Sequence, residues 1–538
     1  MIRRENQPMN LLSSSLSTRL LRQRLPRVCV PVVGKNAVEM LERAEQVARD
    51  NSFIEFRLDY LSQPAQFFPK LKSFVEYHPH ISLIGTCRRA NNGGKFRGSI
   101  ASQVDVLAKA AAAGCHLVDI ELESAGHLKS SDWQKLKKNS GVILSFHDFH
   151  STKKLEETFE KMAGYPADFL KIVTTAKSLS DNVTMMKFLE AKSDVRAIVG
   201  LCMGEQGIIS RLLSVRAGSA FTFGAANPGE ETAPGQIAAR TLRETYRIDQ
   251  ADAATRVYGV AGDPVSHSLS PVMMNTAFRR ENLNAVYLAL HAKTLSDLMA
   301  CVRDIPIHGM SVTMPYKEAI IRHLDKTDAV TTKIGACNTV IRGQDGHLYG
   351  FNTDVAGVIR PLEQRMAIAG SKFLVLGAGG AARAAVFGLK ERGGEVWVMN
   401  RTSIAGQKLA RQAHAKFIRR PQAAKLTFDA VINATPVGMD IPGNKKPDPP
   451  LLSEKELNTR YLFELVYSPA ETPFTKMARA KGIHIIPGAE MFVHQGARQF
   501  EIWTGKPAPV DEMHRVVMHA LEMRAANRAA AAAAAKKR

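Results

Sequence analysis

KFLVLGAGGAARAAVFGLKERGG, residues 372–394, is the stretch that decides the fold of the second half of the chain. It begins with an apolar run typical of a buried strand, passes through a glycine turn and continues into a helical segment of small residues. Gly377, Gly379 and Gly380 would let backbone amides approach a pyrophosphate at the helix N-terminus. Tight turns also favour glycine, so the pattern gains its meaning from its context.

The next apolar run, VWVMNRT (396–402), ends in Asn400, Arg401 and Thr402. An acidic residue at this place would accept the ribose hydroxyls of NAD, whereas an arginine suits the 2′-phosphate of NADP by charge and by its forked geometry. We therefore expect NADP(H) as cofactor. The alternative is a solvated surface arginine that plays no part in the choice of cofactor.

Further motifs flank this segment on both sides, and each ends an apolar run with groups able to bind a polyol. They are GDPVSHSLSP (262–271), SVTMPYK (311–317), GACNTV (335–340), GFNTD (350–354), NATPVGM (433–439), VYSPAETP (466–473) and GAEMFVHQGARQFEIWTG (488–505). With the glycine turn they resemble the shikimate dehydrogenase family over residues 257 to about 522. The resemblance implies a two-lobed α/β dehydrogenase with a Rossmann-like NADP domain.

The resemblance implies a role for each matching residue. Lys317 and Asp354 would form the catalytic pair, in which the lysine stabilises the developing alkoxide and supplies a proton. Ser268 and Ser270 would hold the substrate carboxylate. The other implied substrate contacts are Thr313, Asn338, Thr353, Tyr467 and Gln495, and the implied cofactor contacts are Gly377, Ala378, Gly379, Gly380, Ala381, Asn400, Arg401, Thr402, Thr435, Met439 and Gly488.

Two positions depart from the family pattern. Ser311 stands where many relatives have Asn, and Met274 stands where His often precedes Asn275. The pair of serines favours shikimate over quinate, although a quinate dehydrogenase activity is the alternative. Away from the motif context, a lone Lys and Asp would form an ordinary solvated ion pair.

The first half of the chain has a different rhythm. Between Val28 and about Gly224, eight short β-rich runs alternate with helical periodicity, which predicts a (β/α)8 TIM barrel because strands buried on both faces need helices between them. The runs are VCVPVV (28–33), FIEFRLDY (53–60), ISLIGTCR (81–88), LVDIEL (117–122), VILSFHDF (142–149), FLKIVTT (169–175), RAIVGLC (196–202) and AFTFGA (220–225).

A lysine inside one of these runs is the most informative residue of the barrel. Burial of Lys171 among apolar neighbours would lower its pKa and supply the free amine that condenses with a ketone. A lysine that reaches solvent or is ion-paired at the barrel mouth is the alternative. His147 lies one βαβ step earlier, which we expect to place it on the adjacent strand at the same level as a proton carrier.

At these residues the sequence resembles type I 3-dehydroquinate dehydratase over residues 28 to about 245. The motifs are EFRLD, TCR, SFHDF, LKIV, Ser210–Arg211 and APGQ. The resemblance implies that Lys171 forms a Schiff base with the ring ketone, while His147 removes a proton and later protonates the departing water. The implied substrate contacts are Glu55, Arg57, Arg88, Arg211, Thr232 and Gln236, with Arg211 on the carboxylate.

Two other readings compete with that function. A class I aldolase also uses a barrel lysine, although a histidine on the preceding strand and several arginines favour dehydration. Many relatives carry Glu where this chain has Asn92, and Asn cannot supply the negative charge that would orient a protonated His147. A ligand-binding scaffold or pseudoenzyme is therefore an alternative. Thr232 replaces a more usual Ser and keeps the hydroxyl.

The expected domain boundaries follow from these motifs. They are a flexible extension over residues 1–27, the dehydratase barrel over 28–245, a linker over 246–256, a substrate-binding lobe over 257–360, an NADP-binding lobe over 361–484, a return to the substrate lobe over 485–525, and an Ala-rich basic tail over 526–538. The expected ligands are 3-dehydroquinate, 3-dehydroshikimate, shikimate and NADP(H), and we expect no metal.

Composition is that of a globular protein, with 45% hydrophobic and 23% charged residues. The formal net charge of +21 raises nucleic acid as a partner, but no zinc-finger spacing or basic-aromatic signature is present, so we expect none. Six scattered cysteines without CxxC pairs predict reduced core thiols, and no apolar run predicts a membrane span. We expect a cytoplasmic enzyme, with a plastid as the alternative if the Arg- and Ser-containing N-terminus is a transit peptide. The sequence sets no oligomeric state.

Overall fold

The computed structural model describes residues 23–265, 268–305, 307–439 and 449–537. The chain forms two compact units, residues 1–255 with 300–305, and residues 256–299 with 306–538. Most of the predicted N-terminal extension, residues 1–22, lies outside the described residues. Leu25, which falls within that predicted extension, is buried among the core residues of the first unit.

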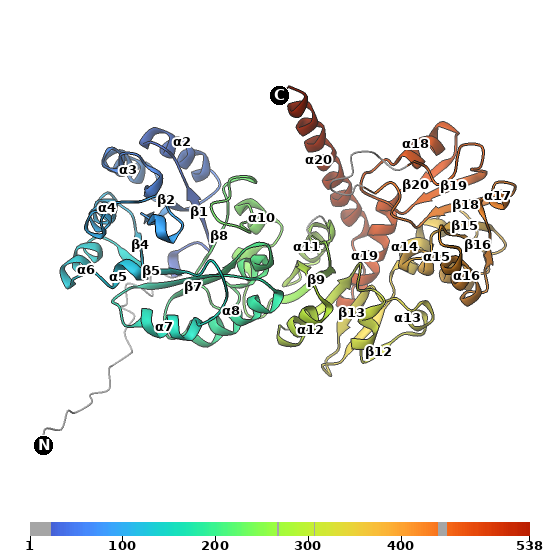
Figure 1. The fold of residues 1–538 in the computed structure, drawn as a ribbon, viewed down its shortest axis with the longest axis horizontal. Helices are drawn as coiled ribbons and strands as arrows, with labels where there is room; N and C mark the ends of the chain where they lie inside the picture. The colour runs from blue at the N-terminus through green and yellow to red at the C-terminus, as the bar shows by residue number, and fades with distance from the viewer. Residues whose placement is uncertain (1–22, 266–267, 306, 440–448, 538) are drawn as a thin grey trace, which may run out of the picture. The chain divides into compact units, whose positions relative to one another are not determined.

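The first unit is an eight-stranded parallel barrel (Figure 1). Each strand pairs with the next one along the chain from β1 to β7, and β8 pairs with β1. The amide of Ala220 donates to the carbonyl of Ile198 at 2.7 Å, which joins the chain before β8 to β7. The strands are β1 (Val28–Val32), β2 (Phe53–Arg57), β3 (Ser82–Thr86), β4 (Leu117–Glu121), β5 (Gly141–His147), β6 (Phe169–Thr175), β7 (Ile198–Met203) and β8 (Thr222–Phe223).

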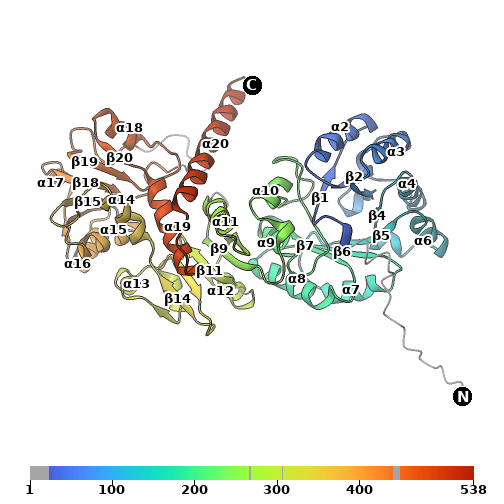
Figure 2. The ribbon, with the colours of Figure 1, turned by 180° about the vertical axis from the view of Figure 1, so that it is seen from behind.

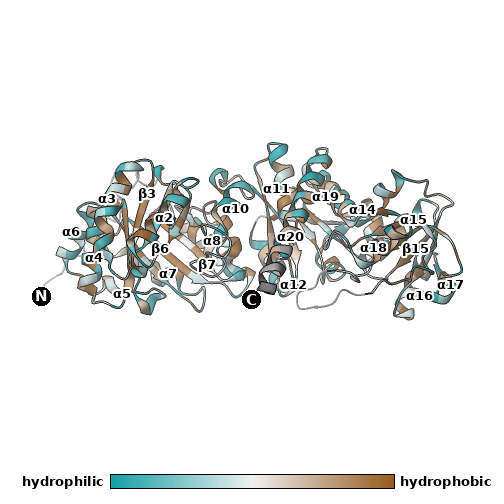
Figure 3. Ribbon diagram, turned by 90° about the horizontal axis from the view of Figure 1, so that it is seen from above, coloured by the Kyte–Doolittle hydropathy of each residue, from teal (hydrophilic) through white to brown (hydrophobic). Residues whose placement is uncertain are grey.

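Helices cover the outside of the barrel and turn their polar faces away from the apolar strands (Figure 3). Side chains fix several of their starts, as where the Asn36 side chain accepts from the amides of Val38 and Glu39. The helices are α2 (Ala37–Ala48), α3 (Phe67–Tyr77), α4 (Ile100–Ala112), α5 (Leu122–Ala125), α6 (Ser130–Lys137), α7 (Leu155–Ala163), α8 (Leu179–Lys192), α9 (Ile208–Leu213) and α10 (Ala239–Glu244), with 3₁₀ turns η1 (Leu58–Tyr60), η2 (Pro64–Gln66), η3 (Ala90–Asn92), η4 (Glu205–Gly207) and η5 (Ile248–Gln250).

The second unit contains two sheets. The first has the order β10-β9-β11-β13-β14-β12 and is mixed, because β13 runs antiparallel to β11 and β14. Its strands are β9 (Arg256–Gly262), β10 (Ala285–His291), β11 (Ile307–Val312), β12 (Lys326–Thr327), β13 (Thr339–Arg342) and β14 (Leu348–Phe351). Around it lie α11 (Ser270–Arg280), α12 (Leu295–Asp304), η6 (Ala319–His323), α13 (Ala329–Ile334), α19 (Gly488–Thr504) and α20 (Val510–Lys537), which Figure 2 shows from behind.

The second sheet of this unit is fully parallel, with the order β17-β16-β15-β18-β19-β20. Strand order reverses beside β15, and ligands of open α/β sheets bind at the carboxyl end of the strands at such a point. Its strands are β15 (Lys372–Leu376), β16 (Glu395–Met399), β17 (Lys416–Phe417), β18 (Phe428–Asn433), β19 (Thr459–Glu464) and β20 (His484–Ile486), and its helices are α14 (Asp354–Glu363), α15 (Gly380–Glu391), α16 (Ser403–Gln412), α17 (Arg420–Ala423) and α18 (Pro473–Ala480).

The predicted fold class is confirmed: a (β/α)8 barrel followed by a two-lobed α/β unit with a Rossmann-like sheet. All six cysteines are buried, and none of them forms a disulfide. Among the described residues, no helix has the length and apolarity that crossing a membrane requires, and no cluster of three metal-ligating side chains occurs. The predicted domain boundaries stay predictions.

Candidate active sites

Lys171 projects from β6 into the barrel and is 5% exposed. The amine lies 3.1 Å from a carboxylate oxygen of Asp119 and 3.7 Å from one of Glu55, with the Phe223 ring centroid at 4.2 Å. The lysine is therefore buried, but two carboxylates accompany it instead of the purely apolar surroundings expected from FLKIVTT. Burial and ion pairing, which the sequence presents as alternatives, occur together.

His147 lies at the carboxyl end of β5, but not at the level of Lys171. The strand register pairs Lys171 with Ser145 and His147 with Val173. Because alternate residues of a strand share a face, the backbone of His147 lies one layer above that of Lys171, toward the barrel mouth. The expectation that the two side chains share a level is wrong by this one layer, since the helix and loops between strands do not fix the register.

Asp119 on β4 links the basic groups of this site. It is 1% exposed, accepts from Arg88 at 2.8 Å and from the Ser145 hydroxyl at 2.6 Å, and pairs with Lys171. Burial alone would raise the pKa of this carboxyl, but the charges of Arg88 and Lys171 outweigh burial and hold it well below its usual value. The acid stays ionised and keeps both cations in place.

The imidazole of His147 is held neutral. Burial lowers its pKa well below the usual value, and the neighbouring charges of Arg88 and Lys171 act in the same direction. Its Nδ1 atom is buried and has no hydrogen-bond partner in the described part of the chain. A neutral imidazole can accept a proton, which is what a general base requires.

Asn92 stands where many relatives carry Glu, and its side chain is hydrogen-bonded to a glutamate of another segment. Its side-chain amide donates to Glu123 at 2.7 Å. The next residue, Gly93, has φ +78°, and a Cβ there would meet the Phe149 ring at 2.8 Å. Phe149 in turn stacks on the His147 ring, with centroids 6.1 Å apart. The loop after β3 thus reaches His147 through the Phe149 ring.

Two of the predicted hydroxyl-binding residues are already engaged with neighbours. Arg57 forms a bidentate pair with Asp59, both bonds being 2.9 Å. Glu55 accepts from the Thr86 hydroxyl at 2.7 Å and pairs with Lys171. Both side chains are buried, so the surrounding contacts fix their positions before any ligand arrives.

Arg211, on α9, differs from the other arginines of the barrel. It is 1% exposed, donates to the carbonyl of Pro234 at 3.1 Å, and has no carboxylate partner among the described residues. Burial lowers its pKa to about 10. The Pro234 loop carries Thr232, whose amide and hydroxyl donate to Gln236 at 2.8 and 3.3 Å. A buried arginine without an acid is suited to bind an anionic ligand.

The lysine of the second unit has a simpler environment. Lys317 donates to Asp354 at 2.6 Å, and the lysine side chain is 19% exposed while that of Asp354 is 4% exposed. Asn338 donates to the other oxygen of Asp354 at 2.7 Å and to the Thr353 hydroxyl at 3.0 Å. The structure therefore brings four of the predicted site residues into one network.

The predicted carboxylate-binding serines lie at the start of α11. The Ser268 hydroxyl accepts from the amide of Ser270 at 3.2 Å, and Ser270 is buried. Thr313 follows β11, where its amide donates to the carbonyl of Ala261 at 2.9 Å. Ser311 bonds to the Tyr287 hydroxyl at 2.6 Å and donates to Gln499 at 2.7 Å.

Gln499 extends this set of bonds to the catalytic pair. Its side-chain amide donates to the carbonyl of Asn338 at 3.2 Å and to the Thr339 hydroxyl at 3.1 Å. One turn earlier on α19, Gln495 is buried and donates to the carbonyl of Phe492 at 2.8 Å. The Phe492 ring stacks on Tyr467, with centroids 4.7 Å apart. Helix α19 thus contacts two of the predicted substrate-binding residues, Asn338 and Tyr467, and carries a third, Gln495.

The glycine turn fits the pyrophosphate of a dinucleotide. Gly377 has φ +118°, and a Cβ there would meet the carbonyl of Ala434 at 2.9 Å. A Cβ at Gly379 would meet nothing within 4 Å, and no side chain caps the N-terminus of α15. The start of α15 is therefore not capped by a side chain and has open space beside Gly379, which favours an anion at this terminus. A Cβ at Gly380 would lie 3.4 Å from Lys317, so the turn adjoins the catalytic pair.

The remaining predicted cofactor residues surround the same edge of the sheet. Arg401 and Thr402 are exposed after β16, Asn400 donates to the carbonyl of Thr402 at 2.9 Å, and Arg401 has no ion-pair partner among the described residues. Thr435 follows β18 and donates to Asn433 at 2.7 Å. Ala378 and Ala381 belong to the glycine turn, Met439 is 38% exposed, and Gly488 begins α19.

Several candidate functional residues were not predicted from the sequence. Asp119 and Glu121 lie in LVDIEL and carry the same signal as Lys171, a charge inside a buried strand. The sequence could therefore have identified them. Asp59 lies two residues after Arg57, and the pairing of the two was readable from RLD. Gln499 gives no such signal, because its partner Asn338 is 161 residues away along the chain.

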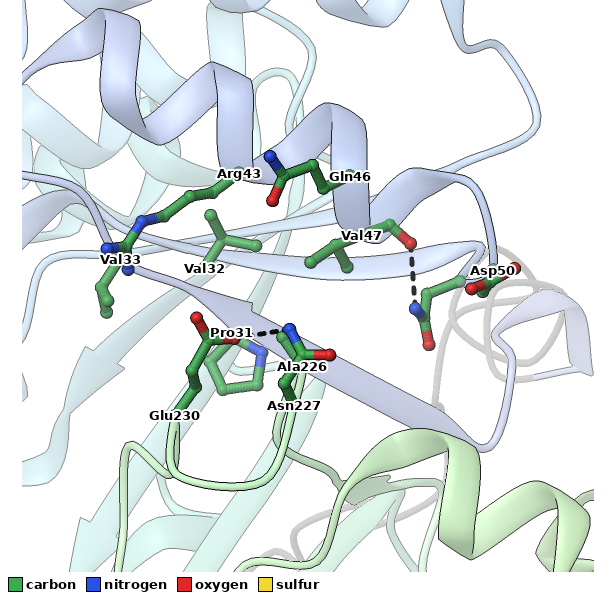
Figure 4. A pocket seen from close by; sticks show the side chains of 11 residues that line it. Pro31, Val32, Val33, Arg43, Gln46, Val47, Asp50, Ala226, Asn227 and Glu230 are labelled. Atoms are coloured by element: carbon green, nitrogen blue, oxygen red, sulfur yellow. Dashed lines mark hydrogen bonds between the residues drawn. The ribbon is translucent and has the colours of Figure 1, made fainter. Parts of the chain in front are cut away.

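One cavity of the barrel lies apart from these residues. It has a volume of about 270 Å³ and lies between α2 and the segment after β8 (Figure 4). Asn51 and Asn227 in its lining bond locally, to the carbonyl of Val47 and to Glu230 at 2.9 Å each. None of the predicted site residues lines it.

Comparison with known proteins matches parts of both units to known families. Residues 28–253 match the family described as Type I 3-dehydroquinase, residues 260–340 the shikimate dehydrogenase substrate binding domain, and residues 488–518 the shikimate 5′-dehydrogenase C-terminal domain. The fold and the two lysine sites thus define the class: a barrel of the Schiff-base lyase type fused to a two-lobed dehydrogenase.

Full-length similarity then gives the family. The chain is 32% identical to the bifunctional 3-dehydroquinate dehydratase/shikimate dehydrogenase, chloroplastic, of Arabidopsis thaliana, over 94% of this chain and 88% of the relative. It belongs to the family of bifunctional 3-dehydroquinate dehydratase/shikimate dehydrogenases. The shikimate dehydrogenase (NADP(+)) of Methanocella arvoryzae is 40% identical over 49% of this chain and 99% of its own. The Thermus thermophilus shikimate 5-dehydrogenase structure is 35% identical, covers 49% of this chain and all of its own, and has a TM-score of 0.45.

Proposed function

We propose that the barrel dehydrates 3-dehydroquinate to 3-dehydroshikimate through a Schiff base on Lys171, and that the second unit reduces 3-dehydroshikimate to shikimate with NADPH. The single observation that carries the proposal is the buried Lys171 amine beside Asp119, with a neutral His147 on the adjacent strand, two residues beyond the register partner of Lys171. A chain that joins these two sites suits consecutive reactions, because the product of the first is the ketone that the second would reduce.

In the proposed dehydratase, the nitrogen of Lys171 condenses with the ring ketone, and a water leaves as the iminium forms. The iminium makes the adjacent C–H acidic, and Nε2 or Nδ1 of His147 takes that proton. The electron pair then expels the neighbouring hydroxyl, which the protonated His147 converts to water. A second water hydrolyses the Schiff base and restores the Lys171 amine. Arg211 would bind the substrate carboxylate, because it is the buried arginine without an acid.

In the proposed dehydrogenase, the cofactor supplies a hydride when it is bound. Gly377, Gly379, Gly380 and the amides of α15 would hold its pyrophosphate, since a Cβ at Gly379 meets nothing within 4 Å. Lys317 would stabilise the oxygen of the substrate ketone as charge develops there and would donate a proton to it. Asp354 holds the Lys317 amine at 2.6 Å, and Asn338 holds Asp354.

A coupled assay tests both activities at once. NADPH absorbance at 340 nm should fall on addition of 3-dehydroquinate alone, because the chain would make its own ketone. Addition of 3-dehydroshikimate tests the second unit separately. A chain that consumes NADPH with 3-dehydroshikimate but not with 3-dehydroquinate would support the scaffold reading of the barrel. Oxidation of quinate by NADP at a rate comparable to shikimate would support the quinate alternative.

The choice of NADP rests on Arg401, which is exposed beside the open end of α15 and has no described acidic partner. The name of the Methanocella arvoryzae relative contains NADP(+). Arg401→Ala should raise the KM for NADPH about tenfold or more and leave the KM for NADH nearly unchanged. The matched control is Arg411→Ala on α16, the helix that follows Arg401, since Arg411 is also exposed. Equal effects on both cofactors would show that Arg401 is only a surface residue.

We further propose that the protein acts on small molecules and needs no metal, nucleic acid or membrane. A cytoplasmic site of action is the expectation, and a plastid remains the alternative, since the name of the Arabidopsis relative contains the word chloroplastic. Fusion of residues 1–27 to a fluorescent protein in plant cells separates the two, because only a transit peptide would direct the fusion to plastids.

A further inference from the structure

A buried carboxylate lies at the carboxyl end of the Rossmann-like sheet, outside the catalytic pair. Glu464 ends β19 and is 1% exposed. The register places it opposite Asn433, the last residue of β18, which is fully buried. This is the edge of the sheet where ligands of such folds bind. Neither the dehydratase mechanism nor the dehydrogenase mechanism uses this acid.

One oxygen of Glu464 holds the segment that follows β18. Asn433 donates to it at 2.8 Å. The carbonyl oxygen of the Asn433 side chain accepts from the amide and the hydroxyl of Thr435, at 3.1 and 2.7 Å. Thr435 is one of the predicted cofactor contacts, and the Asn433 amide group also reaches the carbonyl of Val437 at 3.3 Å. Glu464 thus fixes Asn433, and Asn433 fixes the Thr435 turn.

The same carboxylate holds the segment that carries Tyr467. The amide of Val466 donates to the first oxygen at 3.1 Å, and the Thr472 hydroxyl donates to the second at 3.0 Å. Tyr467 lies between these two anchors and stacks on Phe492 of α19. A Cβ at Gly488 would meet the backbone carbonyl of Glu464 at 2.8 Å, so the start of α19 also packs against this point.

We propose that Glu464 is a positioning residue of the dehydrogenase, whose carboxylate ties the Thr435 turn on the cofactor side to the Tyr467 segment on the substrate side. The proposal rests on the proposed NADPH-dependent dehydrogenase function. Three donors, from Asn433, Val466 and Thr472, converge on two oxygens, so a group without acceptors here would remove one hydrogen bond from each of them. Loss of the carboxylate should therefore loosen both segments together.

The protonation state of Glu464 should make this link between the Thr435 turn and the Tyr467 segment depend on pH. Burial raises its pKa to about 7, while the hydrogen bonds from Asn433, Val466 and Thr472 oppose the rise. No charged side chain of the described residues contributes to this pKa. The nearby acids Glu471 and Glu490 pair with Arg479 and Arg365. As the pH falls through 7, Glu464 gains a proton and loses an acceptor site, so its hydrogen bonds to the two segments weaken.

Three variants of the full chain test the proposal. Glu464→Ala removes every acceptor, and Glu464→Gln keeps the shape and one acceptor but cannot ionise. Asp429→Ala is the matched control, because Asp429 is an exposed acid on β18 that bonds the amide of Lys372 at the opposite end of the sheet. For each variant we would measure kcat, both KM values, the dissociation constant of NADP⁺ by titration calorimetry, and the dehydratase rate.

Glu464→Ala should raise both KM values and the NADP⁺ dissociation constant about tenfold and should leave the dehydratase rate unchanged. Between pH 8 and 6, NADP⁺ binding should weaken about threefold more in the wild type than in Glu464→Gln. The Glu464→Gln variant serves as the reference because titration of the cofactor phosphate affects both proteins equally. Asp429→Ala should match the wild type throughout.

Parallel pH curves for the wild type and Glu464→Gln, or an unchanged KM in a folded Glu464→Ala, would overturn the proposal. If Glu464→Ala does not fold, the comparison of wild type with Glu464→Gln decides. A wild type that neither oxidises NADPH with 3-dehydroshikimate nor binds NADP⁺ would instead overturn the proposed function.

Discussion

The two lysines of this chain lie in opposite kinds of environment. Lys171 is 5% exposed and lies among buried acids and arginines that already bond to one another. Lys317 has a side chain that is 19% exposed and one buried acid, Asp354. The difference follows from the proposed chemistry, because an amine that becomes a covalent nucleophile must be desolvated and placed in advance. An amine that stabilises a developing charge needs only a fixed position beside a pocket that the cofactor completes.

Removal of the Lys171 amine should give the largest effect. Lys171→Ala should lower the dehydratase kcat by about 10⁴-fold or more, because no other described amine lies beside Asp119. Borohydride with 3-dehydroquinate should add substrate mass to the wild type at Lys171, detectable by peptide mass spectrometry, and not to the variant. Lys135→Ala, at an exposed lysine, is the control. A borohydride adduct on another lysine of the wild type would contradict the assignment.

Removal of the Lys317 amine should give a smaller loss. Lys317→Ala should lower the dehydrogenase kcat about 10³-fold with a change in the KM for 3-dehydroshikimate below about threefold, since the group acts on charge in the transition state. The dehydratase rate in the same sample is the internal control, and Lys326→Ala removes an exposed lysine of the same unit. A KM effect that exceeds the kcat effect would make Lys317 a binding residue.

Substitution of Arg211 should separate binding from stability. Arg211→Met should raise the KM for 3-dehydroquinate about 100-fold, because the proposed carboxylate partner is lost. The free energy of unfolding should stay the same or increase, because a buried cation without an acid is removed. Arg216→Met, which loses bonds to the carbonyls of Thr255 and Ala253, is the control. An unchanged KM would exclude Arg211 from the substrate site.

The smallest expected effect is on the pH dependence of the dehydratase. Because the pKa of His147 is depressed, the imidazole is neutral above that pKa and its function as a base is lost only as the pH falls through it. The acid limb of kcat/KM should therefore lie well below 6.5. Asn92→Glu should move that limb upward by about 0.5 pH units, since a negative charge favours the imidazolium. Asn91→Glu on the same loop is the control, and a limb at 6.5 in the wild type would contradict the neutral His147.

The sequence predicted the elements of both units better than their contacts. All eight barrel strands lie where apolar, β-branched runs occur, because strands buried on both faces leave that pattern. The layer of His147 relative to Lys171 was missed, because the register between β5 and β6 depends on packing that the intervening residues do not encode locally.

Networks of buried polar groups were the least predictable feature. Arg57 and Asp59 are two residues apart, and their pairing was readable from the sequence. Glu464 and Asn433 are 31 residues apart, and each looks like an ordinary strand end until the sheet brings them together. The motifs therefore identified residues that would touch a ligand, whereas residues that hold those groups in place emerged only from the three-dimensional contacts.

The six buried cysteines have a practical consequence for work on this chain. Burial raises the pKa of Cys115 to about 12 and that of Cys337 to about 11, and it also raises the pKa of Cys29, Cys87 and Cys202. At pH 7.5 a thiol of pKa 11 is a thiolate in fewer than about one molecule in a thousand, so alkylating reagents and peroxide should spare the folded protein. A single cysteine introduced on the surface would then accept a fluorophore selectively, with every native thiol left in place.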